Sequence, residues 1–381
     1  MIKITDKTKC CGCGACAQIC PRNAIAMQAD NEGFLYPTVD ESKCIKCGLC
    51  LKSCPILNNK KQQITPEVYV AKNKNIEEQK QSSSGGMFSV LANYVLEQKG
   101  IVFGAAFDRN WKVEHCFINK KEDLDKLRRS KYVQSNTLET FREAKKFLES
   151  GKHVLYTGTP CQIAGLKSFL SKDYDNLLTV DIICHSTPSP KVWQDFLAQN
   201  YDTSKLIKID FRDKKDGWNK SELRFYFKDR KDYIANKQPA LFVKGFIAGL
   251  FSRPSCYNCY FKYFNRFSDF TIGDAWGYDH YAPEMFDKNG LSVIFINNKK
   301  AKEVFNKLKM NLNYKQELLK TIIEYNPRYQ SSIKQDKKRS RFFGRYQNED
   351  INKLIRELTY RPLSKRALGF IKRMCKKVIK I

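Results

Sequence analysis

Residues 10–21, CCGCGACAQICP, and residues 44–55, CIKCGLCLKSCP, carry the same cysteine pattern twice. In each run four cysteines follow the form CxxCxxCxxxC, and a proline comes directly after the last one. A recurrence of this kind is an internal duplication, which indicates a small unit built from two related halves. The spacing of the thiols then decides which metal group the unit holds.

Three close cysteines wrap one corner of an iron-sulfur cubane, but they cannot supply its fourth thiolate. The spacing therefore predicts two 4Fe-4S clusters, each completed by the last cysteine of the other run. We assign the first cluster to Cys10, Cys13, Cys16 and Cys54, and the second to Cys44, Cys47, Cys50 and Cys20. A pair of zinc sites is the alternative, although zinc requires neither the third close cysteine nor the proline. Cys11 has no counterpart in the second run and is not expected to be a ligand.

The composition bounds the class of protein. The chain has 381 residues, of which 42% are hydrophobic, so it can bury a core and is not mainly disordered. No apolar run reaches the length of a membrane-spanning helix, and MIKITDKTKC lacks a signal region, so we expect a cytoplasmic protein. In a reducing compartment its 15 cysteines indicate metal or redox chemistry rather than disulfides.

The pattern along the chain predicts an α+β protein with three parts. Residues 1–58 form the two-cluster ferredoxin-like domain, and the polar stretch 57–66, LNNKKQQITP, is a linker. Between residues 67 and 190, β-rich runs alternate with helical stretches, which predicts an α/β layer with much parallel sheet in a mixed α/β domain over 67–335. Residues 336–381 form a basic helical tail.

The basic tail and the net charge of +28 indicate possible binding to anionic partners, namely a membrane surface, an acidic protein or nucleic acid. The end of the tail predicts a basic amphipathic helix that lies on an anionic membrane surface, packs on the protein or docks onto an acidic partner, in that order of preference. Its apolar positions are Leu363, Ala367, Phe370, Ile371, Met374, Val378 and Ile381. The lysines are otherwise spread along the chain without a nucleic-acid-binding motif, so we expect no specific nucleic acid.

Four further cysteines lie in polar or turn-like settings, and they are Cys161, Cys184, Cys256 and Cys259. They make one complete ligand set for a third 4Fe-4S cluster, but the pattern favours equally that each is a small buried hydrophobe. Residues 82–86, SSSGG, directly precede an expected helix. Such a run forms a phosphate cradle or, more often, only a capped helix.

Six segments together resemble the coenzyme F420 hydrogenase/dehydrogenase beta-subunit family, over residues 67–335. They are SSSGGMF (82–88), SKYVQS (130–135), TGTPCQIAGL (157–166), DIICHSTPSP (181–190), RPSCYNCYF (253–261) and SDFTIGDAWG (268–277). The resemblance implies an iron-sulfur flavoprotein whose third cluster is held by the four inner cysteines. It also implies an FAD site lined by Ser84, Gly85, Gly86, Ser130, Lys131 and Tyr132, with Thr157, Gly158 and Thr159 beside it.

Three residues are the candidates for catalysis. Lys131 tunes the flavin or, as the alternative, is a solvated lysine. Asp274 shapes the substrate side or ends a turn, and His185 relays a proton or is structural. The family often has glycine in place of Ser186 and an aromatic residue in place of Ala275, which leaves the substrate open.

The predicted function is an iron-sulfur flavin-dependent oxidoreductase. It passes electrons between a ferredoxin-like carrier and an organic two-electron substrate through 4Fe-4S clusters and FAD. The alternative is a non-catalytic electron-transfer or adaptor subunit of a larger redox or cell-surface polysaccharide biosynthesis complex. Location in the cytoplasm, with contact at the inner face of the membrane through the tail, completes the expectation.

Overall fold

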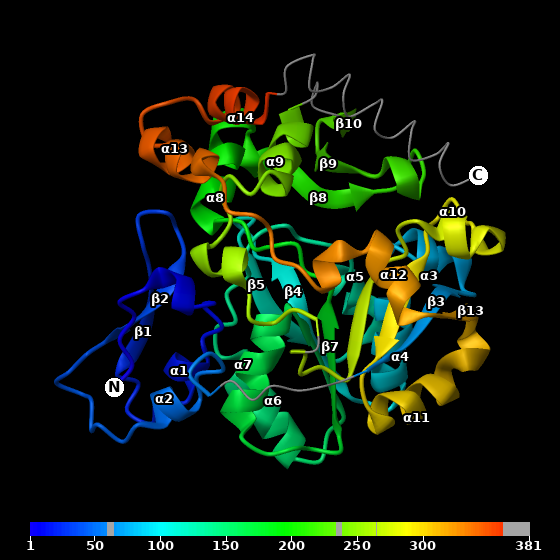
Figure 1. The fold of residues 1–381 in the computed structure, drawn as a ribbon, viewed down its shortest axis with the longest axis horizontal. Helices are drawn as coiled ribbons and strands as arrows, with labels where there is room; N and C mark the ends of the chain where they lie inside the picture. Colours follow the sequence, from blue (N-terminus) through cyan, green and yellow to red (C-terminus); the bar gives the residue numbers. More distant parts are fainter. Residues whose placement is uncertain (59–64, 234–237, 264, 361–381) are drawn as a thin grey trace.

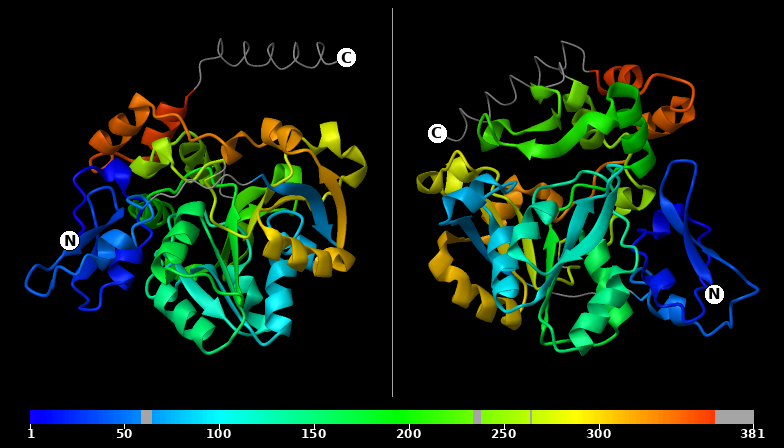
Figure 2. Two further views of the ribbon diagram at one scale, coloured as in Figure 1. Left: turned by 60° about the horizontal axis from the view of Figure 1, so that its bottom comes forward. Right: turned by 180° about the vertical axis from the view of Figure 1, so that it is seen from behind.

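The computed structural model describes residues 1–58, 65–233, 238–263 and 265–360. The N-terminal unit, blue in Figure 1, has two short helices and a hairpin whose two strands pair antiparallel. These elements are α1 (Ala15–Gln18), β1 (Ile25–Ala29), β2 (Leu35–Val39) and α2 (Leu49–Lys52). The unit lies at one side of the molecule in both views of Figure 2, where α1 packs against α6 and α7.

An eight-stranded mixed sheet forms the centre of the molecule. Its four middle strands, β11, β7, β6 and β4, are parallel neighbours, and antiparallel strands flank them on both sides. The order is β13 (Leu312–Glu317), β3 (Glu67–Asn73), β12 (Ser292–Ile296), β11 (Phe270–Asp274), β7 (Leu177–Ile182), β6 (Val154–Gly158), β4 (Ile101–Phe107) and β5 (Val113–Ile118). The expected α/β sheet is confirmed as mixed, with its parallel part limited to the middle.

Alternating apolar residues give this sheet two buried faces. Tyr69 and Ala71 of β3 point to one face, whereas Val68 and Val70 point to the other. The first face is covered by α4 (Met87–Glu97), α5 (Leu124–Leu127) and α11 (Lys299–Leu308). The second is covered by α6 (Thr140–Glu149) and α7 (Pro160–Leu170) at one end and by α12 (Leu319–Tyr325) at the other.

A second, smaller sheet of three antiparallel strands lies above the first in Figure 1. Its strands are β8 (Leu206–Asp213), β9 (Glu222–Phe227) and β10 (Arg230–Tyr233), packed with α8 (Pro190–Asn200) and α9 (Gln238–Ile247). Its core is largely aromatic and includes Trp193, Phe211 and Phe225. The chain also forms the short helices α3 (Ile76–Lys80) and α10 (Tyr278–Tyr281).

The beginning of the expected tail packs against the rest of the protein. Helices α13 (Lys337–Arg345) and α14 (Ile351–Thr359) bury Phe342, Leu354 and Ile355 in the aromatic core of the small sheet. The predicted amphipathic helix, with its seven apolar positions, lies in residues 361–381 and therefore outside the described residues.

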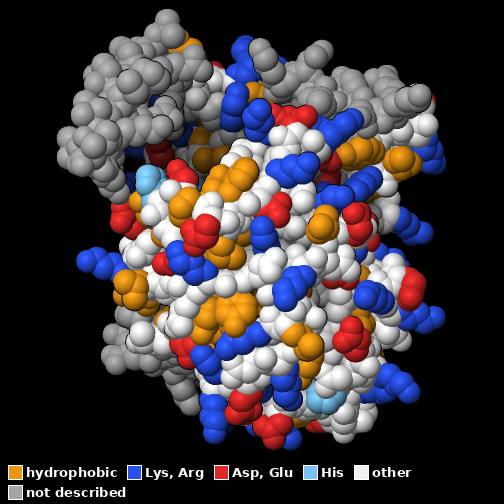
Figure 3. Space-filling view, turned by 90° about the vertical axis from the view of Figure 1, so that its right-hand side faces the viewer, with side chains coloured by type: hydrophobic (Ala, Val, Ile, Leu, Met, Phe, Trp, Pro, Cys, Tyr) orange, Lys and Arg blue, Asp and Glu red, His pale blue; other side chains and the backbone are white. Residues whose placement is uncertain are grey.

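The distribution of surface charge and the length of the helices bear on the predicted contacts with nucleic acid and membranes. On the face drawn in Figure 3, Lys and Arg side chains are scattered among acidic and apolar ones and do not gather into a stripe. Within the described part of the chain, every helix falls short of the length and apolar character that a membrane span requires.

Candidate iron-sulfur and redox site

The two cysteine runs fold into equivalent loops. Gly14 and Gly48, with φ of 79° and 76°, begin α1 and α2 from left-handed conformations. One turn earlier, Gly12 and Lys46 are also left-handed, with φ of 68° and 54°. A left-handed backbone favours glycine, so Lys46 is unusual at this position. The duplication seen in the sequence is therefore a duplication of backbone geometry.

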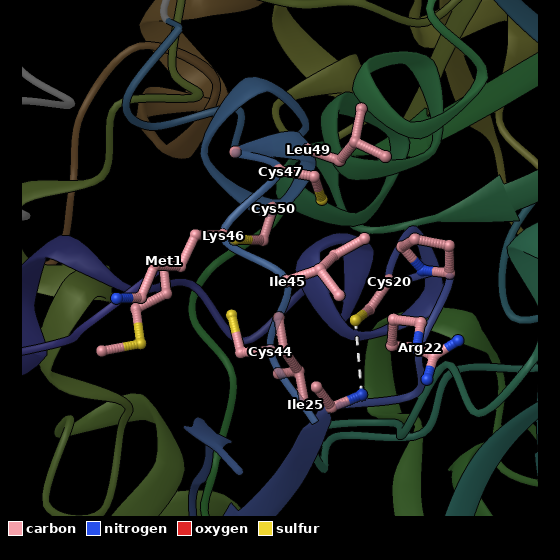
Figure 4. Close-up of a pocket in the computed structure, with 13 residues that line it drawn as sticks. Met1, Cys20, Arg22, Ile25, Cys44, Ile45, Lys46, Cys47, Leu49 and Cys50 are labelled. Atoms are coloured by element: carbon pink, nitrogen blue, oxygen red, sulfur yellow. Dashed lines mark hydrogen bonds between the residues drawn. The ribbon is translucent and has the colours of Figure 1, made fainter. Parts of the chain in front are cut away.

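One thiol group, which we call the distal group, consists of Cys20, Cys44, Cys47 and Cys50. All four line a single pocket, and Figure 4 shows their side chains around it. Three of them come from the second run, whereas Cys20 comes from the first. The backbone N–H of Ala24 donates to Cys20 Sγ over 3.3 Å, and Cys47 is exposed. This set has the membership that exchange between the runs predicts.

A second group, the proximal group, consists of Cys10, Cys13, Cys16 and Cys54. Burial and, to a smaller extent, the neighbouring thiols of Cys10 and Cys54 raise the pKa of Cys16 to about 12. Burial also raises the pKa of Cys54, which Cys10 reinforces. Cys50 acts on both thiols as well, because α1 and α2 pack together. The last cysteine of the second run thus lies among those of the first.

The inner group consists of Cys161, Cys184, Cys256 and Cys259. Cys161 stands in the first turn of α7, and Cys184 follows β7, so the carboxyl ends of two parallel strands carry them to one edge of the sheet. The other two lie in and after the short helix η5 (Pro254–Asn258). Burial raises the pKa of Cys259 to about 12, with further contributions from Cys161 and Cys256. Residues far apart in sequence therefore converge here.

These groups fit iron-sulfur clusters. In the proximal and inner groups, buried thiols such as Cys16 and Cys259 have their pKa raised by their neighbours, and they cannot ionise together unless a cationic centre binds them. The irons of a cubane supply that charge. Hydrogen-bond donors to sulfur accompany them: Thr187 N donates to Cys256 Sγ over 3.4 Å, and Thr159 Oγ1 lies 3.2 Å from Cys161 Sγ. No three His, Cys, Asp or Glu side chains in the described ranges converge closely enough to ligate a single metal ion.

Cys11 connects the proximal group to the inner one. Its buried side chain packs in one cluster with those of Cys13 and Cys161, which belong to different groups, and Cys13 raises the pKa of its thiol. Helix α7 comes equally close to the ferredoxin-like unit, because a Cβ on Gly165 would lie 2.8 Å from Cys13 Sγ. Cys11 has no counterpart in the second run, and this difference is the sequence signal for its separate position.

The segments around the expected flavin site also come together. Ser130 N donates to Ser83 Oγ over 2.8 Å, which joins the SSSGG loop to the SKY loop. The Ser84 hydroxyl donates to the carbonyl of Leu291. Gly85 and Gly86 are packed against protein atoms, since a Cβ on either would meet β3 or its neighbours within 3.1 Å. Both glycines therefore serve close packing beneath α4.

Lys131 is partly buried beside this loop. Its ammonium donates to the carbonyls of Lys126, Arg128 and Arg129 at the end of α5, and burial lowers its pKa to about 8. Nε2 of the buried His115 lies 2.9 Å from the Thr157 carbonyl oxygen. Burial lowers the pKa of His115, and the nearby charge of Lys131 also lowers it. Gly158 and Thr159 follow at the end of β6, where Thr159 caps α7.

Asp274 ends β11 and holds an arginine that sequence reasoning missed. Arg212 donates to both carboxylate oxygens of Asp274 over 2.8 and 3.2 Å, and to the hydroxyl of Tyr132 over 3.4 Å. Trp218 Nε1 donates to the same carboxylate over 2.9 Å, and its ring stacks on Trp276 at 5.1 Å. Asp274 is thus connected through Arg212 to Tyr132, which was predicted to line the flavin site, and through Trp218 to Trp276. Trp276 is exposed.

Three models of known protein families match the chain. The family model described as "4Fe-4S dicluster domain" matches residues 9–57. The models for "Coenzyme F420 hydrogenase/dehydrogenase, beta subunit", N-term and C terminus, match residues 68–142 and 151–320. The chain belongs to the coenzyme F420 hydrogenase/dehydrogenase beta-subunit family. It carries the family's fold behind an N-terminal unit that binds 4Fe-4S clusters, which confirms the predicted iron-sulfur chemistry.

A solved structure resembles this member of the beta-subunit family in part. It is the F420-reducing [NiFe] hydrogenase complex from Methanosarcina barkeri, studied by xenon derivatization, one chain of which is 20% identical. The match covers 70% of this chain and 90% of that one, with a TM-score of 0.45. No curated protein sequence matches the chain.

His185, which the sequence predicts as a proton relay or a structural residue, directly follows Cys184 of the inner group. Its ring meets Phe246 edge-on at 4.9 Å, and Phe246 in turn stacks on Tyr132 at 4.9 Å. Burial lowers the pKa of His185 to about 4, with Arg328 and Lys262 adding to the effect, so its ring is neutral near pH 7. His185, the neighbour of Cys184 in the chain, is thus linked to Tyr132 through the ring of Phe246.

Proposed function

We propose that the chain is an iron-sulfur flavin-dependent oxidoreductase that passes electrons between a ferredoxin-like carrier and an organic two-electron substrate. The observation that carries the proposal is the contact of Cys11 with both Cys13 and Cys161, because it brings the ferredoxin-like unit next to a third group of cysteines. A ferredoxin-like unit that only stored electrons would have no need of that contact.

The three thiol groups have separate tasks in this proposal. The distal group, with Cys47 exposed, faces the solvent and is where a carrier protein exchanges electrons. The proximal group lies between it and the inner group. When bound, the clusters carry electrons singly, and a flavin converts them into the pairs that an organic substrate requires.

The residues proposed for the flavin side lie around Tyr132. The SSSGG and SKY loops, joined through Ser83 and Ser130, border it, and Arg212 and Asp274 fix its hydroxyl. His185 and Phe246 separate Tyr132 from Cys184 without an intervening charge, since the pKa of His185, lowered by burial, keeps its ring neutral. This neutral aromatic bridge supports a route from the inner group toward Tyr132.

Cofactor content tests the proposal. We expect about twelve irons, a matching amount of acid-labile sulfide and about one flavin per chain in protein purified without oxygen. A fully reconstituted and folded sample without flavin, with either about eight or about twelve irons, would overturn it. The inner-group variant Cys256→Ser, which should lose about four irons and keep the rest, is the matched control.

An electron-transfer or adaptor subunit without flavin is the second candidate. It is favoured by the hydrogen bonds that already occupy the expected flavin residues: the ammonium of Lys131 and the hydroxyl of Ser84 are both held by protein carbonyls. This candidate predicts about twelve irons without flavin, together with stable binding to a partner enzyme. Flavin release and a pull-down on the same sample separate the two candidates.

A further inference from the structure

We propose that Arg253 is a buried positive charge placed between the proximal and inner groups, where it raises the reduction potential of the proximal cluster and holds the two groups in register. This inference rests on the proposed function, since it requires clusters at both groups. Arg253 is fully buried and begins the RPSCYNCYF segment that supplies two inner cysteines.

The guanidinium contacts the proximal loop at several points. Its Nε donates to the Cys10 carbonyl over 2.8 Å, and Nη2 donates to Cys10 Sγ over 3.6 Å. Nη2 also donates to the Leu35 carbonyl over 2.9 Å, and Nη1 donates to Gln134 Oε1 over 3.1 Å. The ring of Tyr36 lies 4.3 Å from the guanidinium carbon. The side chain is thus immobilised against the sulfur that it faces.

The same side chain acts on the inner group. Its backbone N–H donates to Thr187, whose own amide donates to Cys256 Sγ. Its charge also reaches the thiols of Cys161 and Cys256. One residue therefore contacts the proximal group through its side chain and supports the inner group through its backbone.

The surroundings of Arg253 lack a counter-ion. Within the described ranges no acidic side chain forms an ion pair with it, and its partners are carbonyls, an amide, a thiol and aromatic rings. A buried guanidinium without an anionic partner is costly, and Arg stays charged at every physiological pH. Thiolates bound to a cluster supply the missing negative charge.

The two cysteine loops differ at one turn, which carries Gly12, beside Arg253, in the first run and Lys46 in the second. A Cβ on Gly12 would lie 2.6 Å from Arg253 Nη1, so the proximal loop has room for the guanidinium only with glycine there. The equivalent turn of the distal loop carries Lys46 in the same left-handed conformation. The first run is therefore adapted to Arg253, and the second is not.

The charge has a defined effect on electron transfer. A reduced cluster carries more negative charge than an oxidised one, so a nearby buried cation stabilises the reduced form and raises the potential. When one electron passes between the two groups, Arg253 keeps its proton, and no bond forms or breaks. It is a positioning residue, because it acts on the reaction only through the cysteine ligands.

Redox titration of the reconstituted full chain, followed by EPR, tests the inference. We expect Arg253→Gln to shift the midpoint potential of the proximal cluster to more negative values and Arg253→Lys to shift it less. The control is the pair Glu32→Gln with Arg339→Gln, which removes an ion pair that holds the ferredoxin-like unit without changing the net charge. The control should keep wild-type potentials.

A second variant covers the case in which Arg253→Gln does not fold. Gln134→Glu keeps the side-chain shape and places a carboxylate against Arg253 Nη1, so it should shift the same potential in the same direction. Unchanged potentials in variants that retain all their iron would overturn the inference and leave the proposed function standing. A wild-type chain without the clusters would overturn both.

Discussion

Gly12 and Lys46 occupy the same turn of two duplicated cysteine loops, and both are left-handed, with φ of 68° and 54°. Only the first of these turns is pressed by another part of the chain, since a Cβ on Gly12 would collide with Arg253. The two halves of the ferredoxin-like unit thus keep one backbone while one half faces the rest of the protein and the other carries the solvent-exposed Cys47. The predictions below depend on that division.

Gly12→Ala should cost more stability than Gly48→Ala. Both positions are left-handed, so both substitutions strain the backbone, by about 1 kcal/mol. A Cβ on Gly48 meets nothing within 4 Å, whereas one on Gly12 meets Arg253, so we expect a total loss of about 2–3 kcal/mol for Gly12→Ala. Anaerobic urea denaturation of the reconstituted variants measures the difference. Equal losses would show that Arg253 yields to the added methyl group.

Cys54→Ser should disturb the cluster of Cys10, Cys13 and Cys16 rather than that of its sequence neighbours. The reason is that its thiol lies among the proximal cysteines. Cys20→Ser is the reciprocal variant, since Cys20 lines the distal pocket. EPR and Mössbauer spectra of the two variants should show loss of different clusters. The exchanged assignment fails if each variant loses the cluster of its own run.

We expect the free energy of unfolding to increase as the pH rises from about 7 toward 10.5, because the pKa of Lys214 differs between the folded and the unfolded chain. Burial, and then the positive charges of Arg129 and Arg212, lower the pKa of its ammonium from 10.5 to about 7. In that interval the unfolded chain binds a proton that the folded chain has released, so the free energy of unfolding increases with pH.

The measurement for Lys214 is urea denaturation at pH 7 and pH 9. Lys214→Met should lose the pH-dependent gain, whereas Lys215→Met, which replaces an exposed neighbour, should keep it. A wild-type gain no larger than that of Lys214→Met would contradict the prediction. The ammonium also donates to the Ser84 carbonyl, so the same variant reports on the SSSGG loop.

Asp274→Asn should lower the free energy of unfolding by about 2 kcal/mol, because it leaves the buried guanidinium of Arg212 without its carboxylate. Replacing both partners, with Arg212→Met and Asp274→Leu, should cost less than the sum of the single changes. Denaturation followed by tryptophan fluorescence is a sensitive probe, since Trp218 donates to Asp274 and stacks on Trp276. Additive losses would mean that the ion pair contributes nothing.

The sequence by itself determined the iron-sulfur chemistry and the parts of the chain that carry it. The repeated cysteine spacing is local information, because ligands a few residues apart reach one cubane whatever surrounds them. The alternation of strands and helices over residues 67–190 was equally readable, since burial on two faces imposes its own periods on the sequence. The four inner cysteines were named, but their convergence could not be derived from spacing.

Only the tertiary structure decided how these parts meet. Arg253 lies 243 residues from Cys10 in the chain, and no periodicity links residues at such a distance. The contact of Cys11 with Cys161 and the pairing of Arg212 with Asp274 likewise depend on how the sheets pack. Local sequence patterns report the geometry of single elements, whereas the positions of the thiol groups relative to one another are set by long-range packing between elements.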